Sequence, residues 1–185
     1  MKILLISDTE ERSLWDNWTE ATARSLADVD FILSAGDLKA EYLEFLVTML
    51  NVPLVYVRGN HDGQYDERPP EGCENAEDTI VELECGNATS GQRVRILGLG
   101  GSMRYNPNAR FQYTENEMRA RLLKSSPKLL RHKGIDIFVT HAPARGQGDM
   151  DDLPHRGFEC FNTVLDKFKP QFMVHGHVHM NYGNL

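Results

Sequence analysis

The chain has few cysteines, no long apolar run and no excess of positive charge, and each absence narrows the classes of function. Its three cysteines, Cys73, Cys85 and Cys160, are odd in number and widely spaced, which disfavours a disulfide framework or a cysteine-based zinc site. No apolar run approaches a membrane span, and the one at the N-terminus is too short for a signal-peptide core. We therefore expect a cytoplasmic protein with free thiols.

The net charge of −7 gives the chain no general attraction for nucleic acid or anionic membranes. Nucleic acid therefore enters only as a candidate substrate. An anionic substrate would need a local positive centre, which bound metal ions could supply. The length of 185 residues suits one domain, so we expect residues 1–185 to form a single unit.

Apolar runs of strand length alternate with stripes of helical spacing in the first third of the chain. Runs near residues 3–6, 31–33 and 54–57 predict strands, and residues 14–26 and 42–50 carry helical stripes between them. This β-α-β-α-β order predicts an α/β fold with a mainly parallel central sheet.

The rest of the chain predicts a second, antiparallel region and further strands. Residues 80–83 and 94–97 flank glycines, as in a hairpin, and residues 135–140 and 172–174 are strand-like. Thr114 and Glu117 have the spacing of a capping box at a helix start. The acidic, proline-containing stretch 64–78 is typical of a long surface loop.

Polar residues directly follow five of the predicted strands. In an open α/β sheet the carboxyl ends of the strands share one edge, where ligands bind. Residues from both ends of the chain would therefore meet in one cleft, and those at the strand ends are Asp8, Asp37, Asn60, His141 and His177.

These residue types suit a site for two divalent metal ions. The carboxylate of Asp37 has two oxygens and can bridge ions that lie about 3.5–4 Å apart. His177 and His179 are two residues apart and can reach neighbouring ions from one segment. His61 is adjacent to the ligand Asn60, and Asp62 could orient its imidazole, which would suit a general acid.

The motifs resemble those of the calcineurin-like metallophosphoesterase family. That family's pattern runs Asp-x-His, Gly-Asp, Gly-Asn-His-Asp/Glu, a lone histidine and Gly-His-x-His. The matches occur in this order over nearly the whole chain, at Asp8, Gly36-Asp37, Gly59-Asn60-His61-Asp62, His141 and Gly176-His177-Val178-His179.

The resemblance implies an α/β fold that is a four-layer α-β-β-α sandwich of two mixed sheets. It also implies hydrolysis of a phosphate mono- or diester by a hydroxide that bridges two metal ions, with His61 as the acid. The ligands it implies are Asp8, Asp37 and His179 for the first metal, and Asp37, Asn60, His141 and His177 for the second.

Two features depart from the family pattern. Glu10 stands where the first motif has histidine, and it lies on the same face as Asp8, so we expect it to be the replacement ligand; the alternative is a solvated loop residue. A carboxylate there favours manganese over softer ions, with iron, zinc, nickel and magnesium as alternatives. The resemblance also predicts strands after His179, and a missing strand would leave an open sheet edge through which the chain could form an oligomer.

Candidate substrate contacts are Arg104, His155 and Arg156, whose side chains can reach a phosphate. The stretch around Arg104, which includes Tyr105, favours an ordinary surface loop over a phosphate and base contact. The phosphoesterase hypothesis has two alternatives. The chain could be a serine/threonine-type protein phosphatase, or it could be a catalytically weak scaffold that kept the fold.

Overall fold

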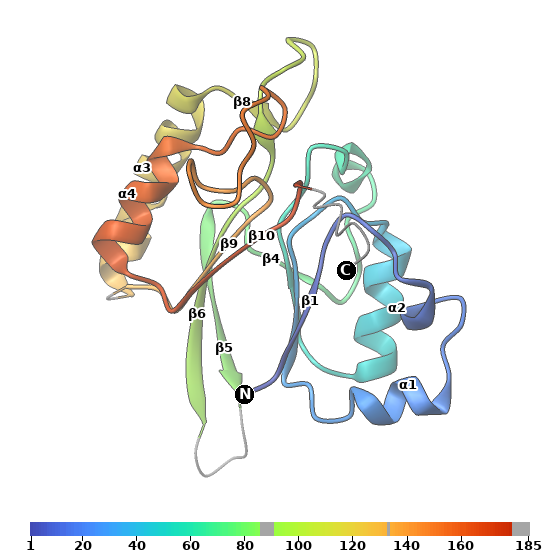
Figure 1. Cartoon of the computed structure of the whole chain (residues 1–185). Helices are drawn as coiled ribbons and strands as arrows, with labels where there is room; N and C mark the ends of the chain where they lie inside the picture. Colours follow the sequence, from blue (N-terminus) through green and yellow to red (C-terminus); the bar gives the residue numbers. More distant parts are fainter. Residues whose placement is uncertain (86–90, 133, 179–185) are drawn as a thin grey trace, which may run out of the picture.

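The computed structural model describes residues 1–85, 91–132 and 134–178, and two four-stranded sheets dominate them (Figure 1). The first sheet has the order β1-β2-β3-β4, and all its pairings are parallel. Its strands are β1 (Ile3–Ile6), β2 (Phe31–Ser34), β3 (Leu54–Tyr56) and β4 (Glu74–Asn75).

The second sheet has the order β10-β9-β6-β5 and is mixed. The β5–β6 hairpin is antiparallel, whereas β6, β9 and β10 pair in parallel. Its strands are β5 (Thr79–Cys85), β6 (Gln92–Leu99), β9 (Ile137–Thr140) and β10 (Phe172–His175). Both the predicted parallel region and the predicted hairpin are therefore confirmed.

Alternation along the strands divides the buried side chains between the two faces of each sheet. In β2, Phe31 and Leu33 belong to the core between the sheets, together with Ile96 and Val139 of the second sheet. Ile32, which lies between them in sequence, belongs instead to the core under the first helices. Strands buried on both faces explain the nearly continuous apolar runs in the sequence.

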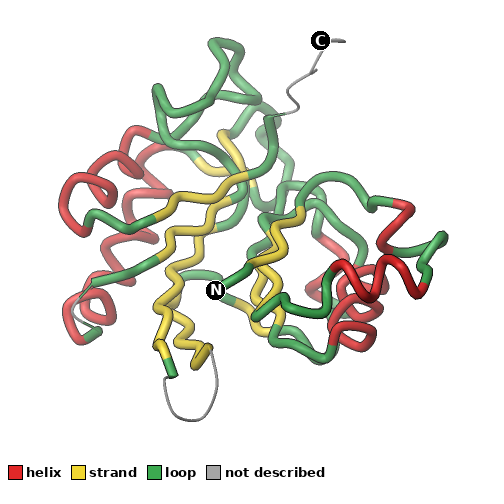
Figure 2. The backbone as a smooth tube through the Cα atoms, turned by 60° about the horizontal axis from the view of Figure 1, so that its bottom comes forward, coloured by secondary structure: helices red, strands yellow, loops and turns green. Residues whose placement is uncertain are grey.

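Helices cover both outer faces, which completes four layers (Figures 1 and 2). The first sheet is covered by α1 (Glu20–Ser25) and α2 (Ala40–Leu50), and the second by α3 (Glu115–Arg131) and α4 (Glu159–Phe168). The predicted α-β-β-α sandwich is confirmed. None of the described helices combines the length and apolar character needed to cross a bilayer.

The predicted helix over residues 14–26 is wrong in its extent. A 3-10 helix covers Arg12–Leu14, and α1 begins only at Glu20, where the Thr19 side chain accepts a hydrogen bond from Thr22 N. The helical spacing has another cause, because Trp15 and Trp18 pack on α2, with ring centroids 5.4 and 5.7 Å from those of Tyr42 and Phe45. Tertiary packing therefore produced the apolar pattern without a continuous helix.

The regions expected to be loops contain short strands. The stretch 64–78 includes β4, which extends the first sheet, and residues 102–113 begin with β7 (Ser102–Met103) and end with β8 (Gln112–Tyr113). The expected capping box is present, because Thr114 N donates to the Glu117 carboxylate and Glu117 N donates to the Thr114 hydroxyl. Loop composition alone does not reveal pairings of two residues.

Candidate metal centre

The polar residues predicted at the strand ends do lie there, at one edge of the two sheets. Three of them have a left-handed backbone, with φ of 61° at Asp8, 56° at Asp37 and 67° at His177. Such conformations cost on the order of 1 kcal/mol or more in non-glycine residues and cluster at functional sites. Three of the strand ends therefore carry the kind of backbone conformation that marks functional sites.

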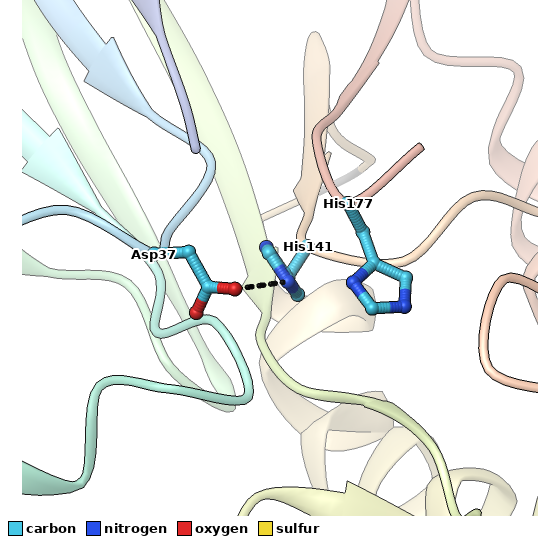
Figure 3. Close-up of side chains that lie close together, drawn as sticks. All are labelled: Asp37, His141 and His177. Atoms are coloured by element: carbon cyan, nitrogen blue, oxygen red, sulfur yellow. Dashed lines mark ion pairs between the residues drawn. The ribbon is translucent and has the colours of Figure 1, made fainter. Parts of the chain in front are cut away.

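Asp37, His141 and His177 form the group of described residues that could hold a metal ion (Figure 3). One potential ligand atom from each lies within 4.8 Å of the others. The His141 Nε2 atom lies 3.3 Å from Asp37 Oδ2 and 3.0 Å from Asn60 Oδ1. Asn60 thus completes a set of four side chains from strands of both sheets.

Backbone carbonyls select which nitrogen of each imidazole faces the centre. The His141 Nδ1 atom lies 2.8 Å from the carbonyl oxygen of Ala35, and the His177 Nε2 atom lies 2.8 Å from that of Pro154. A carbonyl only accepts hydrogen bonds, so each of these nitrogens carries the proton. In neutral imidazoles the opposite nitrogens, His141 Nε2 and His177 Nδ1, therefore present lone pairs, which is how metal-ligating histidines are usually held.

The Asp37 carboxylate and the two imidazoles shift one another's pKa values. Burial acts to lower the pKa of His141, but the adjacent Asp37 carboxylate, together with Asp8 and the Ala35 carbonyl, raises it overall. Burial also acts to raise the pKa of Asp37, yet His141 and the His61 backbone N–H together hold that pKa below its usual range. For His177, burial lowers the pKa to about 4, so its ring is neutral and able to bind metal at neutral pH. A divalent ion would supply the positive charge beside the Asp37 carboxylate that a proton on His141 otherwise supplies.

Two glycines let the carboxylates approach the backbone closely. A Cβ atom on Gly59 would lie 1.9 Å from Asp37 Oδ1, and one on Gly176 would lie 2.4 Å from Asp8 Oδ2. The Asp8 carboxylate also accepts the backbone N–H of His177, at 2.9 and 3.1 Å. The glycines of the sequence motifs are therefore explained by space as well as by turn geometry.

Asp62 is buried and binds two backbone amides of the loops that carry the site. Its side chain is 2% exposed, and its Oδ2 atom accepts the backbone N–H groups of Asp37 at 2.8 Å and Gly59 at 2.7 Å. Burial raises the pKa of Asp62 to about 6. One oxygen of this carboxylate is thus occupied by two loop amides, and its role in orienting the His61 imidazole stays a prediction. His61 itself is exposed, and its backbone N–H donates to Asp37 Oδ1 at 2.8 Å.

The ligands expected for the first metal are less closely gathered. The Glu10 carboxylate accepts the Lys39 backbone N–H at 3.1 Å, beside the start of α2, and its other oxygen lies 3.9 Å from Lys39 Nζ. Asp8 and Glu10 lie outside the group formed by Asp37 and the two histidines. His179 lies outside the described residues. The ligand role of Glu10 stays a prediction.

The predicted substrate contacts are divided by the structure. Arg104 folds back, so that its guanidinium donates to the Gln112 carbonyl and pairs with Glu117 at 2.9 Å. The His155 ring packs on His177, with centroids 5.2 Å apart. Arg156 instead lines a separate cavity of about 420 Å³ with Met103, Glu115, Arg145, Gly157 and Glu159. Of the three, His155 alone is in ring contact with a residue of the metal group.

Three contributors to the site leave little or no signal in the sequence. The carbonyls of Ala35 and Pro154 hold the histidines through the backbone, which leaves no side-chain signal. Tyr105 reaches Asn60, whose Nδ2 atom donates to the phenol oxygen at 3.3 Å. Its position beside Arg104 in a polar loop is the available sequence signal, although that composition favours an ordinary surface loop.

Comparisons with known proteins agree with this geometry. A family model described as calcineurin-like phosphoesterase matches residues 1–181. One UPF0046 protein of Caenorhabditis elegans is 26% identical over 204 residues, which cover 100% of this chain and 66% of that protein. Another from the same organism is 40% identical over 52 residues, which cover 27% of this chain and 13% of the relative. The chain thus spans no more than about two thirds of the length of these relatives.

Proposed function

We propose that this chain, which belongs to the calcineurin-like phosphoesterase family, is a metal-dependent phosphoesterase that hydrolyses a phosphate mono- or diester. The observation that carries the proposal is the convergence of acceptors on one point. His141 Nε2 lies 3.3 Å from an Asp37 oxygen and 3.0 Å from the Asn60 oxygen, while its Nδ1 atom is committed to a carbonyl. A cation at that point would bind these acceptors in place of the proton that His141 Nε2 otherwise carries.

Asp37 would be shared by a pair of divalent ions. The second ion would be held by the shared carboxylate, the Asn60 oxygen and two imidazole nitrogens, and the first would draw on Asp8, Glu10 and His179. When bound, such ions neutralise charge on the phosphoryl oxygens and lower the pKa of water so that it can attack phosphorus. Manganese suits this mixture of carboxylate, amide and imidazole donors.

His61 would protonate the oxygen of the leaving group. Its backbone N–H is tied to the Asp37 carboxylate at 2.8 Å, which keeps the residue beside the shared ligand, and its ring is exposed to an arriving substrate. Asp62 would support this step indirectly, because its contacts with Asp37 N and Gly59 N hold together the two loops that carry the site.

The decisive experiment measures hydrolysis of an aryl phosphate monoester and diester by the Mn²⁺-loaded chain. We expect turnover that disappears on chelation. His141→Ala should reduce turnover by more than the roughly 10–100-fold that changes around metal ligands cause. His132→Ala is the matched control, because that ring pairs with Glu82 at 2.6 Å, away from the metal group.

Circular dichroism in chelator separates loss of the site from loss of the fold, because His141 is fully buried. A wild-type chain that binds metal fully and hydrolyses neither ester would refute the proposal and favour the scaffold alternative.

A further inference from the structure

The segment between β7 and β8 places Tyr105 at the edge of the metal centre. Asn60 is 8% exposed and directs its Oδ1 atom to His141 Nε2 at 3.0 Å, while its Nδ2 atom donates to the Tyr105 phenol at 3.3 Å. Tyr105 is 38% exposed. Tyr105 therefore connects a buried residue of the centre with solvent.

Tyr105 is held by its backbone as well as by its hydroxyl. The buried side chain of Gln112, 3% exposed, accepts the backbone N–H groups of Tyr105 at 3.2 Å and Asn106 at 3.0 Å through a single oxygen. Pairing of β7 with β8 closes the loop at its base. A contact residue on a loop fixed in this way needs little ordering when a ligand binds.

The hydrogen bond from Asn60 leaves the O–H group of Tyr105 able to donate to a ligand. A phenol has one O–H donor and accepts through its oxygen. Because the Asn60 amide donates to that oxygen, the O–H hydrogen can point elsewhere. The arginines of the same loop have carboxylate partners, since Arg104 pairs with Glu117 and Arg110 pairs with Asp66.

We infer that Tyr105 is a substrate-contacting residue whose hydroxyl donates to a phosphoryl oxygen and whose ring flanks the ester group. The inference rests on the proposed function and refines it. A phosphate ester with a flat organic group, aryl or nucleoside, fits best, because an exposed ring offers a stacking face that accepts any planar group.

The test uses the full chain loaded with Mn²⁺ and titrated with inorganic phosphate. Tyr105→Phe keeps the ring and removes the hydroxyl, so we expect phosphate affinity to fall roughly three- to tenfold, as for the loss of one hydrogen bond. Its Mn²⁺ affinity should be unchanged. Tyr113→Phe is the control, because that ring packs under the Arg121 guanidinium at 4.3 Å.

A second variant tests the ring. Tyr105→Leu should lower kcat/KM for an aryl phosphate several-fold more than for a methyl phosphate, whereas Tyr105→Phe should lower both alike.

The outcomes separate the inference from the proposed function. Wild-type phosphate affinity in Tyr105→Phe would overturn the inference while leaving the phosphoesterase intact. The inference would also be overturned if Tyr105→Phe lost Mn²⁺ affinity and regained wild-type phosphate binding at saturating Mn²⁺. Tyr105 would then only support Asn60. A wild-type chain that binds Mn²⁺ but neither binds phosphate nor hydrolyses esters would overturn the proposed function, and the inference with it.

Discussion

Replacing Gly59 with alanine tests the packing that holds Asp37 in the metal centre. The added Cβ atom would lie 1.9 Å from Asp37 Oδ1, 2.4 Å from its Cγ atom and 2.6 Å from its backbone nitrogen. Cβ atoms essentially never approach other heavy atoms closer than 3.0 Å, so raising the separation from 1.9 to 3.0 Å requires a shift of about 1.1 Å. A side-chain rotation cannot absorb this shift, because the backbone nitrogen of Asp37 is also too close.

The magnitude follows from two separate effects. Overpacking a well-packed site costs about 1–3 kcal/mol, which for a domain of this size lowers Tm by roughly 2–12 °C. Metal ligands must also be held within about 0.5 Å of their working positions, so a shift of about 1.1 Å should weaken Mn²⁺ binding by roughly 10–100-fold or more. We expect hydrolysis to fall accordingly.

The assay combines thermal unfolding in chelator, which isolates the packing cost, with Mn²⁺ titration at a temperature where the variant is folded. Gly63→Ala is a matched control in the same segment, because the nearest atom to its added Cβ is 4.0 Å away. The control should stay within about 0.5 kcal/mol of wild type. A Gly59→Ala protein with wild-type Tm and wild-type Mn²⁺ affinity would refute the close approach of Gly59 to Asp37.

Three further predictions concern separate parts of the molecule. His61→Ala should keep the bound metal and lose about 10²–10⁴-fold in turnover; the loss should be smaller for a p-nitrophenolate leaving group, and equal losses for good and poor leaving groups would argue against a general acid. Glu10→Ala should lower Tm in chelator by a few degrees, because the Lys39 N–H loses its acceptor at the start of α2. Glu10→Ala should also weaken Mn²⁺ binding at one of two sites in a calorimetric titration. Unchanged affinity at both sites would mean that Glu10 only accepts the Lys39 N–H at the start of α2. Asp136 accepts three hydrogen bonds from Arg95, at 2.9 Å each, and they hold the pKa of its carboxyl below the usual range. Asp136→Asn should therefore cost about 1 kcal/mol at pH 7, and denaturant titrations should show this difference narrowing as pH falls below about 4, since wild type then loses the same charge.

The chemistry-bearing residues and their elements were predictable from the sequence because they depend on local order. Apolar runs such as Ile3–Ile6 and Phe31–Ser34 form strands wherever both faces are buried, and a polar residue after such a run must emerge at the strand's carboxyl end. Parallel pairing then brings Asp8 and Asp37 to one edge. The sandwich and most of the metal group followed from this rule together with the motif resemblance.

Contacts between distant segments were decided only by the tertiary structure. The carboxylate of Asp62 can accept a hydrogen bond from any donor within its reach. The Asn60-His61-Asp62 stretch therefore does not reveal that its partners are the backbone amides of Asp37 and Gly59. The long side chain of Arg104 can adopt many orientations. It folds back onto Gln112 because β7 pairs with β8, and each of these strands is only two residues long.

Backbone groups carry even less sequence information, although they complete the site. The carbonyl of Pro154, which orients His177, would be present whatever residue stood there, and only the path of the loop brings it within 2.8 Å. The left-handed turns at Asp8, Asp37 and His177 are likewise imposed by the surrounding fold, because non-glycine residues adopt that conformation only when packing and hydrogen bonds outweigh its cost. Sequence order thus determined which groups reach the sheet edge, and long-range packing determined where each one points.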